Sequence, residues 1–128
     1  MPKKILIIDD DIDLVEALRL SLEREGFTVV DAQDGRKGLE KAKSEKPDLI
    51  LLDVMMETQD EGFHVAYQLR KDKETADLPI IMLTAVGQET GFSFNKDKDE
   101  DFLPVNEFVA KPINPDTLIE IVKIQLGL

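Results

Sequence analysis

Acidic, hydroxyl and ammonium side chains follow four separate apolar runs in this sequence. Asp9 and Asp10 come after the first run, and the later runs are followed by Asp53, Thr84 and Lys111. If each run is a buried strand of one parallel sheet, these side chains lie just past the carboxyl ends of the strands, where such sheets bind their ligands. Carboxylates, a hydroxyl and an ammonium group that converge there can hold a divalent cation and accept a phosphoryl group.

Three carboxylates at one point predict a metal site. Asp9, Asp10 and Asp53 repel one another unless a cation neutralises them, and a site with oxygen ligands only suits Mg²⁺. We expect Asp10 and Asp53 to bind the ion directly and Asp9 to act through water. The backbone carbonyl of Met55 would complete the protein ligands. Asp11 is assigned instead to the N-cap of the helix that follows.

Asp53 is the candidate nucleophile, because a carboxylate can take up a phosphoryl group as an acyl phosphate. The metal would neutralise charge on the transferred group. Lys111 would pair with one phosphoryl oxygen as a point charge, and the Thr84 hydroxyl would hydrogen-bond another. Ala85 is small enough to leave room for the group, which would lie against the backbone of Ala85 and Met55.

Apolar runs and helical repeats alternate along the chain and supply the elements that position these residues. Continuous apolar runs predict strands at Lys3–Ile8, Phe27–Ala32, Leu49–Leu52, Pro79–Leu83 and Phe108–Ala110. Helical spacing, with Gly26 as a stop and Asn114 as a cap, predicts helices at Ile12–Glu25, Arg36–Ser44, Gly62–Lys71 and Pro115–Gln125. Strands that alternate with helices indicate a doubly wound parallel α/β sheet with helices on both faces.

The segment from Gly87 to Val105 interrupts this order. It contains a charged run from Lys96 to Asp101 and no apolar stripe at helical spacing. We expect a loop where the fourth helix would stand. Phe92 and Phe94 would form a specialised binding surface or would pack beneath the loop, and the sequence leaves both interpretations open.

Composition limits the class of protein. The chain has 128 residues, 42% of them apolar, which suits a single globular domain. It has no cysteine, so disulfides and thiolate metal sites are excluded. A net charge of −11 argues against direct nucleic-acid binding and suits either a protein partner or solubility alone. No signal peptide or membrane-length apolar run is present in the sequence, and we expect a cytoplasmic protein that does not bind membranes.

The motifs match a known family in order and in spacing. Ile-Ile-Asp9-Asp10-Asp11, Leu-Leu-Asp53-Val-Met-Met, Leu-Thr84-Ala85 and Phe108-Val-Ala-Lys111-Pro112 together resemble the receiver domain of two-component response regulators. The resemblance covers nearly the whole chain. It implies a flavodoxin-like sheet of five parallel strands in the order 2-1-3-4-5.

The resemblance also implies a mechanism. A sensor histidine kinase or a phosphotransfer protein would pass a phosphoryl group from phosphohistidine to Asp53 with Mg²⁺, so the chain would be a signalling phosphoacceptor and not an enzyme. Phe108 falls on the aromatic switch position of the family, where the ring swings inward as Thr84 moves toward the phosphoryl group. Met55 and Val86 fall on two positions that set phosphoryl lifetime. Neither can orient a water molecule, so we expect slow self-dephosphorylation.

Several features depart from the family pattern. Glu57 takes the place of the usual proline after Asp53, and the stretch between Thr84 and Lys111 is longer than usual. We therefore expect the fourth helix, which belongs to the usual dimer face, to be atypical or replaced by a loop. A phosphorylation-dependent homodimer is one of the two outcomes that the sequence allows. Because no effector domain follows Leu128, we expect residues 1–128 to be a stand-alone receiver of the chemotaxis or sporulation phosphorelay type, whose downstream partner is an unidentified protein.

Other classes fit the residues less well. A flavodoxin-like cofactor carrier would need a phosphate loop where three aspartates stand, and a haloacid-dehalogenase-type phosphatase would need an aspartate at Met55. A dinucleotide-binding domain would need a G-x-G-x-x-G turn, which the sequence lacks. The remaining alternative is a pseudo-receiver that binds protein partners without being phosphorylated. His64, the only histidine, is interpreted as a solvated surface residue.

Overall fold

Strands and helices alternate along the chain as the apolar pattern predicts. The structure, a computed structural model, describes residues 3–53, 61–85 and 105–128. The strands are β1 (Lys4–Ile8), β2 (Thr28–Ala32), β3 (Leu49–Asp53), β4 (Ile80–Ala85) and β5 (Glu107–Lys111). The helices are α1 (Ile12–Arg24), α2 (Gly35–Ser44), α3 (Glu61–Lys71) and α6 (Pro115–Gln125). The expected loop in place of the fourth helix lies outside the described residues up to residue 104.

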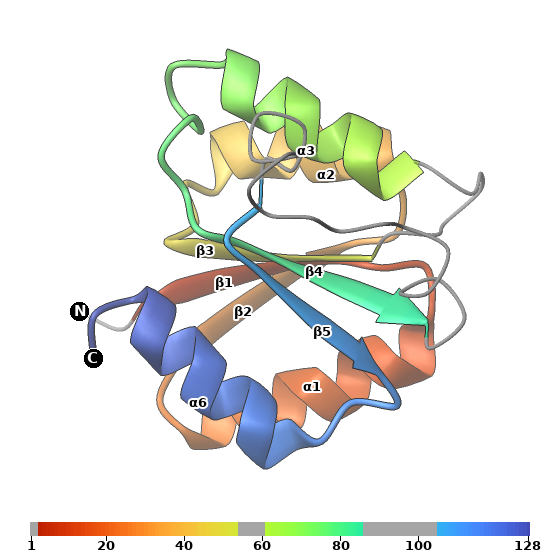
Figure 1. The fold of residues 1–128 in the computed structure, drawn as a ribbon, viewed down its shortest axis with the longest axis vertical. Coiled ribbons are helices and arrows are strands. Elements are labelled where there is room, and N and C mark those ends of the chain that lie inside the picture. The colour runs from red at the N-terminus through yellow and green to blue at the C-terminus, as the bar shows by residue number, and fades with distance from the viewer. Residues whose placement is uncertain (1–2, 54–60, 86–104) are drawn as a thin grey trace, which may run out of the picture.

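All five strands run parallel in one sheet with the order β2-β1-β3-β4-β5. Figure 1 shows α1 and α6 on one face of the sheet and α2 and α3 on the other. This arrangement confirms the doubly wound α/β sheet and the strand order 2-1-3-4-5. Since β1 lies between β2 and β3, the winding direction reverses there, and the carboxyl ends of β1 and β3 flank the crevice where such sheets bind ligands.

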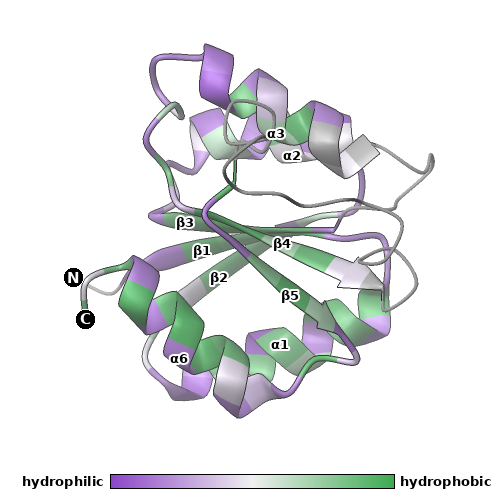
Figure 2. Ribbon diagram, in the orientation of Figure 1, coloured by the Kyte–Doolittle hydropathy of each residue, from purple (hydrophilic) through white to green (hydrophobic). Residues whose placement is uncertain are grey.

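Alternate residues of the buried strands pack on opposite faces of the sheet. In β1, Ile5 and Ile7 pack with α1 and α6, whereas Leu6 and Ile8 pack with α2 and α3. The stretch 49–52 of β3 alternates in the same way and is fully buried. Hydrophobic residues fill the central strands and alternate with hydrophilic ones along the helices (Figure 2). Burial of each such side chain contributes about 1.5–3 kcal/mol, which holds the strands in register beneath the site.

Polar side chains fix where three of the helices begin. Asp11 Oδ1 accepts a hydrogen bond from the backbone N–H of Leu14 at 3.2 Å, which confirms the predicted cap of α1. Asp34 Oδ1 caps α2 by accepting from Lys37 N–H at 2.8 Å. Asn114 caps α6 and is followed by proline at the first helical position, as predicted. The start of α1 matters most here, because the acids that precede it belong to the candidate site.

A glycine lets α2 approach the sheet closely. A Cβ atom placed on Gly38 would lie 2.6 Å from Cδ1 of Ile8 and 2.9 Å from its Cγ1 and Cγ2. Ile8 is fully buried, and it is the residue that directly precedes Asp9. The absence of a side chain at Gly38 therefore sets the packing of α2 against the end of the strand that carries the first acids.

The first two strands end where the sequence predicts, but β3, β4 and β5 end later than predicted. Asp53 and Lys111 are the last residues of β3 and β5, and Thr84 lies inside β4, so these residues do not follow their strands as expected. Thr84 is paired with Ala110, and Ala85 with Lys111. The prediction ended each strand with its apolar run, whereas the backbone ladder continues through the polar residues because pairing does not depend on side-chain polarity. Within the described ranges, no helix has the length and apolar character needed to cross a membrane.

Candidate functional site

The parallel register brings the predicted residues to one edge of the sheet. Asp9 follows the end of β1, and its backbone N–H donates to the carbonyl of Ala32 at 3.0 Å. Asp53 ends β3 beside Leu83 of β4. Lys111 ends β5, whose neighbour across the ladder is the end of β4. The strands thus place Asp9, Asp53 and Lys111 at the same carboxyl edge.

Three carboxylates gather at this edge as the sequence predicts. One oxygen each of Asp9, Asp10 and Asp53 lies within 4.8 Å of the others. Asp9 is 0% exposed and Asp53 is 4% exposed, whereas Asp10 faces solvent. Asp9 Oδ1 also accepts a hydrogen bond from the backbone N–H of Asp11 at 2.9 Å, which fixes the orientation of its carboxylate. Buried carboxylates this close repel one another, so the donor set and its spacing suit a hard divalent cation.

Lys111 bridges two of the acids. Its Nζ lies 3.3 Å from Asp9 Oδ2 and 3.4 Å from Asp53 Oδ1. Burial lowers the pKa of Lys111, but the charges of Asp9 and Asp53 outweigh this effect, so the pKa lies above its ordinary value. Lys111 is therefore a fixed positive charge at neutral pH, and it offsets part of the negative charge in the cleft.

Thr84 carries a buried hydroxyl without a hydrogen-bond partner among the described residues. The residue is 0% exposed, and its Oγ1 makes no hydrogen bond there. A buried hydroxyl that lacks a partner costs about 1–3 kcal/mol. Native proteins usually satisfy such groups, and the exceptions call for an explanation. A ligand oxygen in the cleft would supply the missing partner.

Phe108 lies next to this region in β5. It pairs with Met82 across the ladder, and its half-buried side chain packs against the core between the sheet and helices α2 and α3. Ala85 is described only as a residue of β4 paired with Lys111. Met55 lies outside the described residues, so the predictions that rest on it stay predictions.

Of the remaining residues predicted beyond the site, only His64 lies within the described part of the chain. His64 lies exposed on α3, in agreement with its interpretation as a surface residue. Glu57, Val86, Phe92 and Phe94 lie outside the described residues. Predictions about their loops therefore stay untested by the structure.

Sequence reasoning missed a polar residue that positions β5. Asn106 Oδ1 accepts hydrogen bonds from the backbone N–H of Ile80 at 2.9 Å and from Arg70 Nη2 at 2.9 Å. Arg70 also donates to the carbonyl of Leu78 at 2.6 Å. These bonds fix the entry of β5 beside β4, and β5 carries Lys111 into the cleft. The available signal was an amide side chain two residues before the predicted strand Phe108–Ala110, since side chains of this type often bond to the backbone near the ends of elements.

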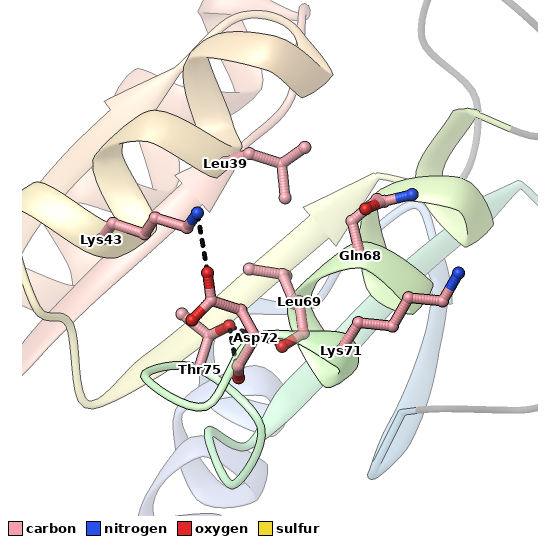
Figure 3. A pocket seen from close by; sticks show the side chains of 7 residues that line it. All are labelled: Leu39, Lys43, Gln68, Leu69, Lys71, Asp72 and Thr75. Carbon is pink, nitrogen blue, oxygen red and sulfur yellow. Dashed lines mark hydrogen bonds and ion pairs between the residues drawn. The ribbon is translucent and has the colours of Figure 1, made fainter.

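A separate hollow lies on the α2–α3 side of the sheet. It measures about 230 Å³, and the acids of the cleft do not line it. Figure 3 shows Lys43 of α2 reaching to Asp72, where Nζ and Oδ2 are 2.7 Å apart. Thr75, at the back of the hollow, donates to the carbonyl of Leu69 at 2.5 Å. Three polar residues that line the hollow, Lys43, Asp72 and Thr75, thus already have partners. The candidate site is therefore the acidic cleft.

The fold and the cleft define a doubly wound α/β domain with an acidic pocket at its switch point. The family described as response regulator receiver domain matches residues 5–123. The chain belongs to this family. It is therefore a phosphoacceptor signalling domain of two-component systems and not a classical enzyme, and Asp9, Asp10 and Asp53 form an acidic triad typical of a receiver Mg²⁺ site.

Individual relatives agree with the family match. Protein PilH of Pseudomonas aeruginosa is 33% identical over 124 residues, which cover 97% of this chain and 98% of PilH. The alkaline phosphatase synthesis transcriptional regulatory protein PhoP of Bacillus subtilis is 42% identical over 122 residues, but the chain spans only 45% of its length. The structure of the Vibrio cholerae chemotaxis protein CheY4 has a TM-score of 0.82 and 29% identity, and the match covers 97% of this chain and 98% of that one.

Proposed function

We propose that Asp53 accepts a phosphoryl group from a phosphohistidine of a sensor histidine kinase or phosphotransfer protein. An oxygen of the Asp53 carboxylate attacks phosphorus, a new O–P bond forms and the N–P bond of the donor breaks. The histidine nitrogen keeps the electron pair of that bond and takes up a proton from solvent. The product is an acyl phosphate at the carboxyl edge of β3.

The other residues of the cleft have distinct proposed roles. Asp10 and Asp53 would hold Mg²⁺ directly, Asp9 would act through water, and the backbone carbonyl of Met55 would complete the set. A bound Mg²⁺ ion would neutralise negative charge on the transferred phosphoryl group. Lys111 leaves its position between the acids and pairs with a phosphoryl oxygen.

Thr84 and Phe108 are proposed to carry the response. The Thr84 hydroxyl donates a hydrogen bond to the phosphoryl group, beside the backbone of Ala85, and so gains the partner that it lacks in the described residues. As Thr84 moves toward the phosphoryl group, the ring of Phe108 on the neighbouring strand swings inward. The changed surface then binds a downstream protein.

One observation carries this proposal. A buried carboxylate, a cation and a buried hydroxyl that has no hydrogen-bond partner among the described residues lie at the carboxyl edge of neighbouring strands. A domain that only bound partners would have no physical need for this combination, because carboxylates held close together repel one another and a buried hydroxyl without a hydrogen bond costs stability. The pseudo-receiver is the alternative that the experiment must exclude.

Intact mass after incubation with acetyl phosphate and Mg²⁺ tests the proposal. Wild type should gain the mass of one phosphoryl group, and Asp53→Asn should gain none. Asp13→Asn, which removes an acid from the first turn of α1 outside the triad, is the matched control and should behave as wild type. No gain in wild type would favour the pseudo-receiver, and a gain in Asp53→Asn would assign the acceptor elsewhere.

The domain organisation, location and partners of this protein are also proposed. PilH matches the chain along nearly the whole length of both proteins, which supports a single receiver domain over residues 1–128. We propose a cytoplasmic location and a downstream protein partner, with no direct binding to nucleic acid or membranes. Slow self-dephosphorylation and phosphorylation-dependent homodimerisation stay predictions.

A further inference from the structure

The outer edge of β2 is a strand edge with backbone groups that face away from the sheet. β2 is the terminal strand and pairs only with β1. The N–H of Thr28 and the carbonyl of Ala32 bond to the β1 side at 2.9 and 3.0 Å. Because successive residues of a strand turn their backbone groups to alternate sides, Val29 and Asp31 direct theirs outward.

Two cations cover both outward carbonyls of this edge. Arg19 of α1 donates from Nη1 to the Val29 carbonyl at 2.9 Å, and Lys41 of α2 donates from Nζ to the Asp31 carbonyl at 2.5 Å. The two donors come from helices on opposite faces of the sheet (Figure 1). Arg19 Nη2 also lies 2.6 Å from Asp31 Oδ1, and this ion pair holds the guanidinium against the edge.

The edge would otherwise suit pairing with a second strand. Its sequence Thr-Val-Val-Asp-Ala has three β-branched residues and carries no proline. Exposed edges of this kind are templates for another chain. A second copy could pair with this edge in antiparallel orientation, about a twofold axis at Val30. Val29 of each copy would then lie opposite Asp31 of the other, because these two residues direct their backbone groups outward.

We propose that Arg19 and Lys41 close the outer edge of β2 against pairing with the β2 strand of a second copy. Charge-assisted hydrogen bonds hold both carbonyls, so an incoming strand must displace them before it can pair. The proposal involves none of the residues assigned to phosphoryl transfer, so its outcome is independent of the proposed function.

Molecular mass in solution tests this proposal on the whole chain. Arg19→Met/Lys41→Met keeps the apolar stems of both side chains and removes both donors. Arg24→Met/Lys37→Met is the matched control, because it removes one cation from each of the same helices at exposed positions. Light scattering over a concentration series should show a mass that rises toward twice the monomer mass for the first variant. Wild type and the control should stay monomeric.

A third variant locates the contact. It adds Asp31→Pro to the Arg19→Met/Lys41→Met variant. The proline removes an outward backbone N–H and leaves the hydrogen bonds to β1 in place, and proline is tolerated at such edge positions. This variant should return to the monomer mass. A monomeric Arg19→Met/Lys41→Met variant with native circular dichroism would overturn the proposal, as would self-association that Asp31→Pro leaves unchanged or a wild type that already associates through β2.

A single substitution covers the case in which the double variant does not fold. Lys41→Met leaves the Arg19–Asp31 ion pair in place and frees only the Asp31 carbonyl. It should self-associate more than wild type does at the same concentration. If the double variant is unfolded and Lys41→Met has the mass of wild type, the proposal is overturned.

Discussion

Lys111 Nζ lies 3.4 Å from Oδ1 of Asp53, so the side chain proposed to hold the phosphoryl group also neutralises the carboxylate that would receive it. The same ammonium lies 3.3 Å from the fully buried Asp9. Before phosphoryl transfer, Lys111 therefore stabilises the folded cleft. After transfer, it would stabilise the product.

Lys111→Met should destabilise the protein in the absence of divalent cations. We expect a loss of about 1–3 kcal/mol, less than the loss for a fully buried pair, because the Lys111 side chain is 27% exposed. Mg²⁺ should restore more stability to this variant than to wild type, because a bound cation replaces the missing charge. Urea unfolding with EDTA and with Mg²⁺ measures both effects. Lys123→Met, which removes a cation from an exposed ion pair with Glu25, should show neither.

The raised pKa of Lys111 predicts a stability difference that depends on pH. A lysine whose folded pKa lies above its unfolded value of about 10.4 contributes stability that is fully present below that pH. The contribution is lost as pH rises through the folded pKa. The gap in unfolding free energy between wild type and Lys111→Met, measured in EDTA, should therefore be constant near neutrality and should narrow above about pH 10.4. A gap that widens there would contradict the assigned direction.

Asp10→Asn tests the cation site without disturbing the core. Asp10 is the exposed member of the triad, so neutralising it should relieve repulsion from Asp9 and Asp53 and raise stability slightly in EDTA. The same change should remove most of the stabilisation that Mg²⁺ gives to wild type, since a direct ligand is lost. Thermal unfolding across a Mg²⁺ titration measures both. Equal Mg²⁺ responses in Asp10→Asn and in Asp13→Asn would show that Asp10 is not a ligand.

Thr84→Val tests whether the buried hydroxyl has opposite effects on stability and on phosphorylation. Removing a hydroxyl without a described partner should stabilise the unphosphorylated protein by about 1 kcal/mol. It should also lower the phosphorylated fraction reached with acetyl phosphate, because the phosphoryl group loses a donor. Thr84→Ser keeps the hydroxyl and should keep the phosphorylation yield. A Thr84→Val variant that is less stable than wild type would mean that the hydroxyl has a partner beyond the described residues.

The sequence predicted the fold and the convergence of the site, because both follow from local patterns. A continuous apolar run such as 49–52 indicates a buried parallel strand, and Asp53 at its end is then placed by topology. Asp11 was correctly assigned to a cap because a cap depends on neighbours within one turn. The short, half-exposed β5 was predicted with shorter bounds, since its ends are set by pairing with β4.

Other features depend on contacts between distant residues, and no local pattern predicts the individual hydrogen bonds and ion pairs. The position of Lys111 between Asp9 and Asp53 requires three strand ends in a definite register. The hydrogen bonds of Arg19 and Lys41 to β2 depend on two helices on opposite faces. Neither relation has a fixed spacing along the chain, so periodicity and motifs cannot reveal it.

Gly38→Ala should destabilise the protein although it improves helix propensity. Alanine is favoured over glycine in a helix by about 1 kcal/mol, but overpacking of a core costs about 1–3 kcal/mol. The added Cβ would lie 2.6 Å from Cδ1 of the fully buried Ile8 and 2.9 Å from its Cγ1 and Cγ2, so rotation of the Cδ1 end alone would not relieve the overlap. We expect a net loss of about 1 kcal/mol in urea unfolding. Lys37→Ala, at the exposed neighbouring position of α2, should be neutral or slightly stabilising.

A double-mutant cycle then identifies Ile8 as the cause. Ile8→Val removes Cδ1, the atom nearest to the added Cβ, and alone should cost about 0.5–1.5 kcal/mol. Combined with Gly38→Ala it should cost less than the sum of the two single changes, because valine lacks the closest of the three contacting atoms and keeps only the two Cγ atoms at 2.9 Å. Strictly additive free energies would place the strain elsewhere. Since Ile8 leads directly into Asp9, we also expect Gly38→Ala to weaken Mg²⁺-dependent stabilisation and the double variant to recover part of it.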